Sequence, residues 1–226
     1  MKKLIMLVLS VALLCMSGEA LAKKHVACDS IKPLMVNKPI EWNDTRLTLM
    51  REYAKIHYGM NIDSIVPQMI ILHWTASNSL TGTYNYFYPA AGKYNTANGR
   101  LNVASHYLVD RDGTIYQLTP ETALNRHAIG YNWCAIGVEN VGGVNSKADL
   151  TKAQVQANIA LIRYLSDKYA SIKYVIGHYQ VDRARSTGLY IEKIPGYHSD
   201  KVDPGPYFMS QVHQAFKHSK LKFLAE

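Results

Sequence analysis

The sequence contains few cysteines and only one long apolar run. Cys15, Cys28 and Cys134 are the only cysteines among 226 residues, which excludes a small disulfide-rich scaffold. Beyond residue 22, no stretch approaches the roughly 20 apolar residues that a membrane-spanning helix needs. No internal repeat is visible. The sequence therefore indicates a non-repetitive globular protein with no transmembrane segment in its mature chain.

Acidic residues are also scarce compared with basic ones. The chain has 25 Lys and Arg against 17 Asp and Glu, a formal net charge of +8 at pH 7. A basic protein attracts anionic polymers such as cell wall, nucleic acid or acidic glycans, and charge alone does not choose among them. Because the basic residues are scattered, with no run longer than two, we expect no nucleic-acid partner.

The first 22 residues have the pattern of an export signal. Lys2 and Lys3 form a positive segment, an apolar stretch follows over 4–16, and Ala20-Leu21-Ala22 is a small-residue cleavage pattern. The apolar stretch is too short to span a bilayer. We therefore expect cleavage after Ala22 and a periplasmic or secreted product.

Two cysteines would remain after this cleavage. In an oxidising compartment Cys28 and Cys134 could form a disulfide. They could equally be two buried thiols, because the sequence does not give the Cα separation that decides between them.

The N-terminal part of the mature chain contains one clear helix. Residues 23–42 have no periodicity and are expected to form an arm. Asn43 is a suitable N-cap and Gly59 a suitable stop for a helix between them. We therefore divide the mature chain into an arm and helix, 23–65, packed on a main domain, 66–226.

Strand and helix patterns are mixed in the main domain. Thr151 and Gln154 form a capping box that opens one helix, and a closing helix is expected over 207–217. Residues 75–102 are expected to be a long loop whose aromatic residues contact a sugar or peptide, or pack on themselves. Strands are predicted at 69–74, 103–110, 114–118, 135–141 and 173–177, with a hairpin turn at Asp112-Gly113. The fold class is therefore α/β (mixed α+β), with a single central mixed sheet flanked by helices.

Two histidines and a late aspartate have the composition of a metal site. His73 ends one apolar run and His178 ends another, while Asp203 precedes Pro204-Gly205-Pro206. Zinc binds imidazole nitrogens and carboxylate oxygens, and a catalytic zinc keeps one position open for water. The prolines would stiffen the backbone beside Asp203, which suits a ligand that must be held still.

Six short motifs occur in a fixed order that resembles a known family. They are Ile71-Leu72-His73-Trp74-Thr75-Ala76, Ser105-His106-Tyr107 with Asp110 to Tyr116, Arg126-His127-Ala128, Ile136-Gly137-Val138-Glu139, Ile176-Gly177-His178 and Lys201-Val202-Asp203-Pro204-Gly205. Together they resemble the zinc-dependent N-acetylmuramoyl-L-alanine amidases of the amidase-2 type, relatives of phage lysozyme-type amidases and of peptidoglycan recognition proteins. The resemblance covers about residues 69–208.

The resemblance implies roles for five residues. His73, His178 and Asp203 match the ligands of one zinc ion per chain. Glu139 matches the general base, and a carboxylate can take a proton from water and return it to the leaving nitrogen. Lys201 matches the cation that faces the reacting carbonyl, where it would stabilise an oxyanion.

The segment between His178 and Asp203 is longer than in compact members of the family. We expect it to form a wall of the substrate groove and to reshape specificity. Substrate contacts are expected from four residues near the site: His127, Trp74, Arg185 and Tyr197.

The expected function is that of an exported, monomeric zinc hydrolase. It would cleave the amide bond between N-acetylmuramic acid and L-alanine in peptidoglycan or muropeptides. One alternative is a non-catalytic peptidoglycan-binding protein of the same fold, and another is a zinc peptidase that acts within the stem peptide. Recognition proteins of this fold lose a metal ligand, whereas all three positions are filled here, which favours an enzyme.

Overall fold

The computed structural model describes residues 35–93 and 98–224. The predicted export signal and Cys28 lie outside these residues, whereas Cys134 is fully buried. Both alternatives for the two cysteines therefore stay open. No helix in the described part of the chain combines the length and apolarity that a membrane span requires.

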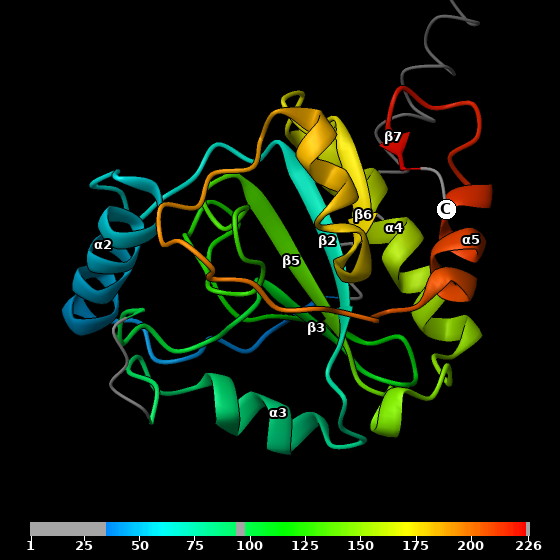
Figure 1. Ribbon diagram of the computed structural model, residues 1–226. Helices are drawn as coiled ribbons and strands as arrows, with labels where there is room; N and C mark the ends of the chain where they lie inside the picture. The colour runs from blue at the N-terminus through cyan, green and yellow to red at the C-terminus, as the bar shows by residue number, and fades with distance from the viewer. Residues whose placement is uncertain (1–34, 94–97, 225–226) are drawn as a thin grey trace, which may run out of the picture. The chain divides into compact units, whose positions relative to one another are not determined.

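A seven-stranded sheet, formed within the described residues, runs through the centre of the fold (Figure 1). Its order is β1-β4-β3-β5-β2-β6-β7, and every pair is parallel except the antiparallel hairpin β3–β4. The strands are β1 (Met35–Asn37), β2 (Met69–Trp74), β3 (Tyr107–Val109), β4 (Ile115–Gln117), β5 (Ala135–Asn140), β6 (Tyr174–Gly177) and β7 (Lys222–Phe223). The predicted mixed α/β fold is confirmed.

Helices α4 (Lys152–Lys168) and α5 (Pro206–Gln214) cover one face of the sheet. Side chains alternate along β2, so Ile70 and Leu72 pack under these helices while Met69 and Ile71 face the other way. The remaining elements are α2 (Asp44–Tyr58), α3 (Leu80–Phe87) and the 3₁₀ turns η2 (Val144–Ser146), η3 (His178–Gln180) and η4 (Arg183–Thr187). In Figure 1, α2 and α3 lie away from the α4–α5 pair.

Local signals set the helix ends that the sequence predicts. The Asn43 side chain accepts a hydrogen bond from the Arg46 amide at the start of α2, and Gly59 ends this helix with a left-handed backbone. Thr151 and Gln154 form the predicted capping box of α4. Each side chain satisfies a backbone group that the helix terminus leaves unpaired.

The structure differs from the sequence-based expectation at α3 and at β1, and it adds the two-residue strand β7 (Lys222–Phe223). The expected loop over 75–102 contains α3, whose start is capped by Ser79 through a hydrogen bond from the Gly82 amide. This helix has eight residues and buries only Thr83 and Phe87. Its buried residues are too few to show the repeating apolar spacing by which a helix is predicted from sequence. The expected arm contributes β1, which pairs with β4 and is three residues long. Alternation cannot be read from so short a strand.

Candidate metal and catalytic site

The predicted site lies where three neighbouring parallel strands end. His73 and Glu139 are register partners on β2 and β5. On the other side of β2, Leu72 is the partner of Gly177, so His178 directly follows β6 beside His73. Because parallel strands end at the same edge of a sheet, the three side chains meet although they are far apart in sequence.

Asp203 completes a cluster with the two histidines. Its Oδ2 lies 3.3 Å from His73 Nδ1 and 3.1 Å from His178 Nδ1. One potential ligand atom from each residue lies within 4.8 Å of the others, and all three residues are buried. Asp203 is held in place by its carbonyl, which accepts a hydrogen bond from the Tyr179 amide at 2.8 Å. These residues could hold a metal ion.

The protonation of this cluster suits metal binding. Burial, with help from the neighbouring His73, lowers the pKa of His178 to about 4. Burial alone would raise the pKa of Asp203, but hydrogen bonds to His178 and His73 outweigh it and hold that pKa below its ordinary value. A neutral imidazole and an ionised carboxylate are the forms in which these groups bind metals.

A third histidine sets the tautomer of His73. His127 Nε2 lies 3.1 Å from the Ala135 carbonyl oxygen, which can only accept, so Nε2 carries the proton. Burial lowers the pKa of His127 well below its ordinary value, so this ring is neutral and its Nδ1 is an acceptor. His73 Nε2 lies 3.1 Å from that Nδ1 and must therefore donate. Once His73 Nδ1 gives up its proton to bind a metal, the lone pair of the ring lies on Nδ1, the atom that faces Asp203.

The His127 ring packs so closely on Gly137 that this position has no room for a side chain. A Cβ atom at Gly137 would lie 2.7 Å from the ring. The Gly137 amide in turn donates to His106 Nδ1 at 2.9 Å, and His106 Nε2 lies 2.9 Å from the Ala123 carbonyl oxygen. Gly137 and His106 thus shape the support behind the metal cluster.

Glu139 presents an unpaired carboxylate to the same region. Its Oε2 atom is buried and has no hydrogen-bond partner among the described residues. Burial raises the pKa of Glu139 well above its ordinary value, Asp203 adds to the rise, and Lys201 opposes it. A carboxylate with a raised pKa in a cleft is a candidate acid or base.

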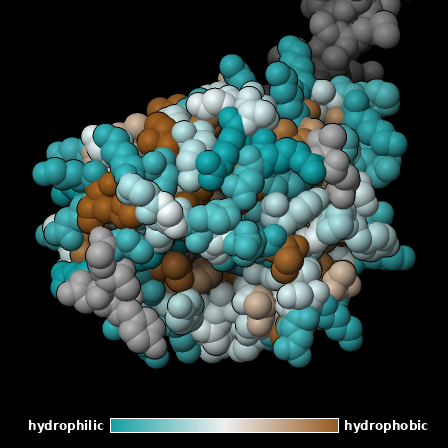
Figure 2. Space-filling view, in the orientation of Figure 1, coloured by the Kyte–Doolittle hydropathy of each residue, from teal (hydrophilic) through white to brown (hydrophobic). Residues whose placement is uncertain are grey.

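A cavity of about 760 Å³ contains these groups. Its lining includes Gly82, Thr83 and Tyr86 of α3 as well as Arg126 and Tyr197. The lining also includes His73, Glu139, His178, Lys201 and Asp203. Figure 2 shows one face of the molecule, where hydrophilic residues predominate and hydrophobic ones form separate patches.

The four predicted substrate residues do not all reach this cavity. Trp74, His127 and Tyr197 line it. Arg185 is not among the lining residues; its guanidinium lies 4.0 Å from the centroid of the Tyr190 ring and pairs with Asp182. Sequence reasoning missed Arg126, Gly82 and Thr83, whereas Tyr86 is one of the aromatic residues that were expected to contact a sugar or peptide or to pack on themselves. The only signal for Arg126 was its place in the Arg126-His127-Ala128 motif.

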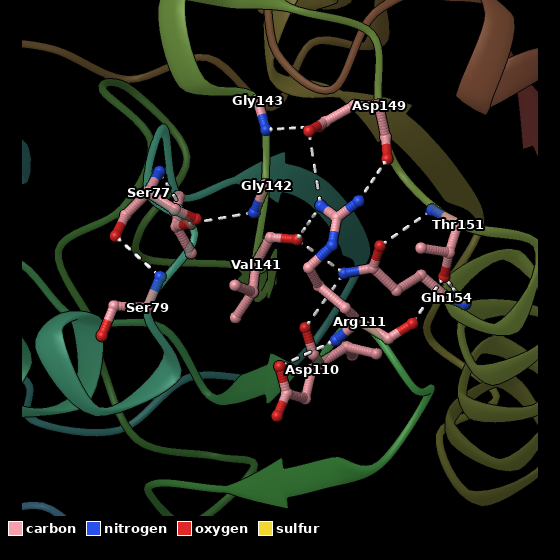
Figure 3. A network of polar contacts seen from close by, with 12 residues as sticks. Ser77, Ser79, Asp110, Arg111, Val141, Gly142, Gly143, Asp149, Thr151 and Gln154 are labelled. Atoms are coloured by element: carbon pink, nitrogen blue, oxygen red, sulfur yellow. Dashed lines mark hydrogen bonds and ion pairs between the residues drawn. The ribbon is translucent and has the colours of Figure 1, made fainter.

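A polar network holds the segment that supports Trp74 (Figure 3). Arg111 Nη2 donates to the Asp149 carbonyl at 3.0 Å, and Asp149 Oδ1 accepts from the Gly143 amide at 2.8 Å. A Cβ atom at Gly143 would lie 2.3 Å from the Trp74 ring. The network therefore fixes the glycine against which this cavity-lining indole packs.

Comparisons with known proteins agree with this geometry. The Amidase_2 family, described as N-acetylmuramoyl-L-alanine amidase, matches residues 63–206. The endolysin of Escherichia phage T7 is 38% identical over 81 residues, which are 34% of this chain and 54% of the relative. The endolysin of Klebsiella phage KP32 is 32% identical over 90 residues, 38% of this chain and 60% of the relative. The chain thus spans only a little more than half the length of these curated relatives.

Among solved structures, the endolysin LysCS from Clostridium intestinale URNW is 25% identical, with a TM-score of 0.44, over 65% of this chain and 82% of that one. The family match carries the assignment, because it extends over more than half of the present sequence. The chain therefore belongs to the Amidase_2 family, N-acetylmuramoyl-L-alanine amidase.

Proposed function

We propose that this protein is a zinc-dependent hydrolase that cleaves the amide bond between N-acetylmuramic acid and L-alanine in peptidoglycan or its fragments. One observation carries the proposal: the buried cluster of His73, His178 and Asp203 shares a cavity with the unpaired carboxylate of Glu139 and with Lys201. Membership of the Amidase_2 family supports the choice of bond. Export by the predicted signal over 1–22 would bring the protein to this substrate.

The cluster fits zinc by the chemistry of its donors. It offers two imidazole nitrogens and one carboxylate, which is a ligand set typical of catalytic zinc. The hydrogen bond between His73 and His127 is the kind of outer contact that orients a ligating imidazole. Zinc bound there would polarise the scissile carbonyl and lower the pKa of a water molecule to about 7.

Glu139 is the proposed general base. Its carboxylate accepts a proton from the water whose oxygen attacks the amide carbon. The same proton is then delivered to the nitrogen as the carbon–nitrogen bond breaks. Burial and Asp203 raise the pKa of Glu139, which makes its carboxylate a stronger base toward the proton of the attacking water.

Lys201 is the proposed stabiliser of the oxyanion. It is exposed, lines the cavity and lowers the pKa of Glu139 by its charge. A cation in this position gains most as negative charge develops on the carbonyl oxygen in the transition state.

Two alternative functions would use the same cavity. A peptidoglycan-binding protein would need the groove but not Glu139, and the complete set of donors favours an enzyme over it. A zinc peptidase would use the same metal and base on a bond within the stem peptide.

Digestion of purified sacculi separates the three functions. The proposed amidase should release whole stem peptides that begin with a free L-alanine, identified by mass, and leave peptide-free glycan. Chelation should stop the release and added zinc should restore it. Stem peptides cut internally would point to the peptidase, and binding without release by the zinc-loaded protein would point to the recognition protein.

A further inference from the structure

Arg126 lines the cavity, and its guanidinium is held in a fixed orientation. Nη1 donates to the Leu101 carbonyl at 2.8 Å, and Nη2 donates to the Tyr197 hydroxyl at 3.0 Å. The guanidinium also lies 5.3 Å from the centroid of the Tyr53 ring. These contacts hold the side chain in place through neutral groups only.

No carboxylate within the described ranges lies at ion-pair distance from Arg126. Arg51 pairs with Asp63 and Arg111 with Asp149, whereas the buried Arg46 donates to backbone carbonyls. Removing an arginine charge from water costs free energy that an anionic partner offsets. Arg126 is therefore a fixed cation whose anionic partner is not among its protein neighbours.

The Tyr197 hydroxyl is positioned by the long segment between His178 and Asp203. Glu192 in this segment contacts His57 Nδ1 on α2 at 2.9 Å, and both side chains are buried. The Lys193 amide donates to the His57 carbonyl at 2.9 Å. The His57 ring also lies 4.8 Å from the Tyr197 ring between centroids. This anchoring makes Tyr197 a firm partner for the Arg126 guanidinium.

The charges that line the cavity are unevenly placed. Apart from histidines, its lining cations are Arg126 and Lys201, and Lys201 is next to the reacting centre. The lining residues of α3 include Gly82, Thr83 and Tyr86, which are uncharged. A charged part of the substrate is therefore best received by Arg126, while these α3 residues suit an uncharged part such as sugar.

We propose that Arg126, oriented by Tyr197, binds a carboxylate of the substrate's peptide and selects substrates in which that carboxylate is free. This inference rests on the proposed amidase function. The planar guanidinium matches a carboxylate through two parallel hydrogen bonds, which a lysine cannot reproduce. Arg126 is thus a specificity-determining residue, and Tyr197 is a positioning residue that acts through it.

A pair of matched substrates tests the assignment. One is an N-acetylmuramoyl peptide with free carboxylates, and the other is the same peptide with its carboxylates amidated. For Arg126→Gln, kcat/KM on the free substrate should fall by about 10- to 100-fold. The loss should appear mainly in KM, because the contact exists before the transition state. The fall in rate on the amidated substrate should be much smaller than the fall on the free substrate, since the amidated substrate never made the charged contact.

Further variants separate the effect of positive charge, the effect of the planar guanidinium and the effect of misfolding. Lys147→Gln removes a positive charge from an exposed residue outside the cavity lining and should leave both substrates unaffected. Arg126→Lys should recover only part of the preference for the free carboxylate, and Tyr197→Phe should lower that preference. The ratio of the two rates is measured on one enzyme sample, so partial misfolding cancels from it.

The outcomes keep the two proposals distinct. If the parent enzyme cleaves both peptides and Arg126→Gln slows both equally, the carboxylate contact is overturned while the amidase function stands. If the parent enzyme already shows no preference for the free carboxylate, the assignment is also overturned. If zinc-loaded parent enzyme releases no peptide from either substrate or from sacculi, the proposed function itself fails.

Discussion

His73 donates a hydrogen bond from Nε2 to His127 Nδ1 across 3.1 Å. The direction of this bond follows from the Ala135 carbonyl, which fixes the proton of His127 on its other nitrogen. The consequence is that Nδ1 is the His73 nitrogen that faces Asp203 and is available to bind a metal. His127, a predicted substrate contact, therefore also supports the candidate metal centre.

Replacing His127 with phenylalanine should weaken zinc binding. Phenylalanine keeps a ring over Gly137 but cannot accept from His73 Nε2, so the tautomer and orientation of His73 are no longer fixed. Loss of a residue that hydrogen-bonds to a metal ligand typically costs about 10- to 100-fold in metal affinity. Competition with a chromophoric chelator measures this, with exposed His218→Phe as the control. Unchanged zinc affinity in folded protein would show that the bond does not orient His73.

Gly137→Ala should destabilise the protein and displace the His127 ring. The new Cβ would lie 2.7 Å from that ring, and such overpacking costs about 1–3 kcal/mol in unfolding free energy. Urea denaturation measures the loss. Gly92→Ala is a matched control, because its Cβ would meet its neighbours at 3.5 Å or more. Equal stability of the two variants would contradict the close packing described for the ring.

Glu139→Gln should retain zinc and fold but lose most turnover. The amide has a similar shape, yet it cannot accept the proton of the attacking water. Loss of a general base costs about 10²- to 10⁴-fold in rate. Release of stem peptides from sacculi gives the rate, and Glu52→Gln, an exposed carboxylate on α2, controls for charge. A near-normal rate would assign the base to another group.

Lys201→Ala should lower kcat more than it raises KM. The negative charge that Lys201 meets develops only in the transition state, so the ground-state complex loses little. Removal of one such stabiliser costs about 10²- to 10³-fold in kcat. Steady-state kinetics on a soluble muramoyl peptide separate the two constants. A raised KM with unchanged kcat would make Lys201 a substrate clamp instead.

Glu121→Gln should lower stability at neutral pH. The Glu121 carboxylate accepts hydrogen bonds at 2.7 Å from the hydroxyls of Tyr107 and Tyr169, and Lys168 Nζ lies 2.7 Å from it. Burial would raise the pKa of Glu121, but these partners lower it below its ordinary value. Hydrogen bonds to a charged group contribute about 1.5–3 kcal/mol, so a loss of this order is expected at pH 7.

The pH dependence of that loss has a definite sign. A carboxylate whose pKa is lowered by folding stabilises the protein above its unfolded pKa, and the contribution disappears as pH falls through the folded value. The difference in urea unfolding free energy between Glu121→Gln and the parent should therefore shrink as the pH is taken below about 4.5. A difference that stays constant from pH 7 into that range would contradict this account.

The sequence by itself determined the parts that depend on local chemistry. Asn43, Gly59 and the Thr151–Gln154 pair act on backbone groups a few residues away, so both ends of α2 and the start of α4 could be predicted. The apolar runs before His73 and His178 predicted two strands, and the structure pairs them with each other. The ordered motifs then predicted that Asp203 would join these two histidines, and the geometry brings all three together.

Only the tertiary structure decided the relationships between distant segments. The bond between His73 and His127 joins residues 54 positions apart, and the bond between Arg126 and Tyr197 joins residues 71 positions apart. Neither contact leaves a period or spacing that sequence reasoning can detect. The three-residue strand β1 and the short helix α3 were missed for the same reason, because short segments are fixed by their packing partners rather than by their own pattern.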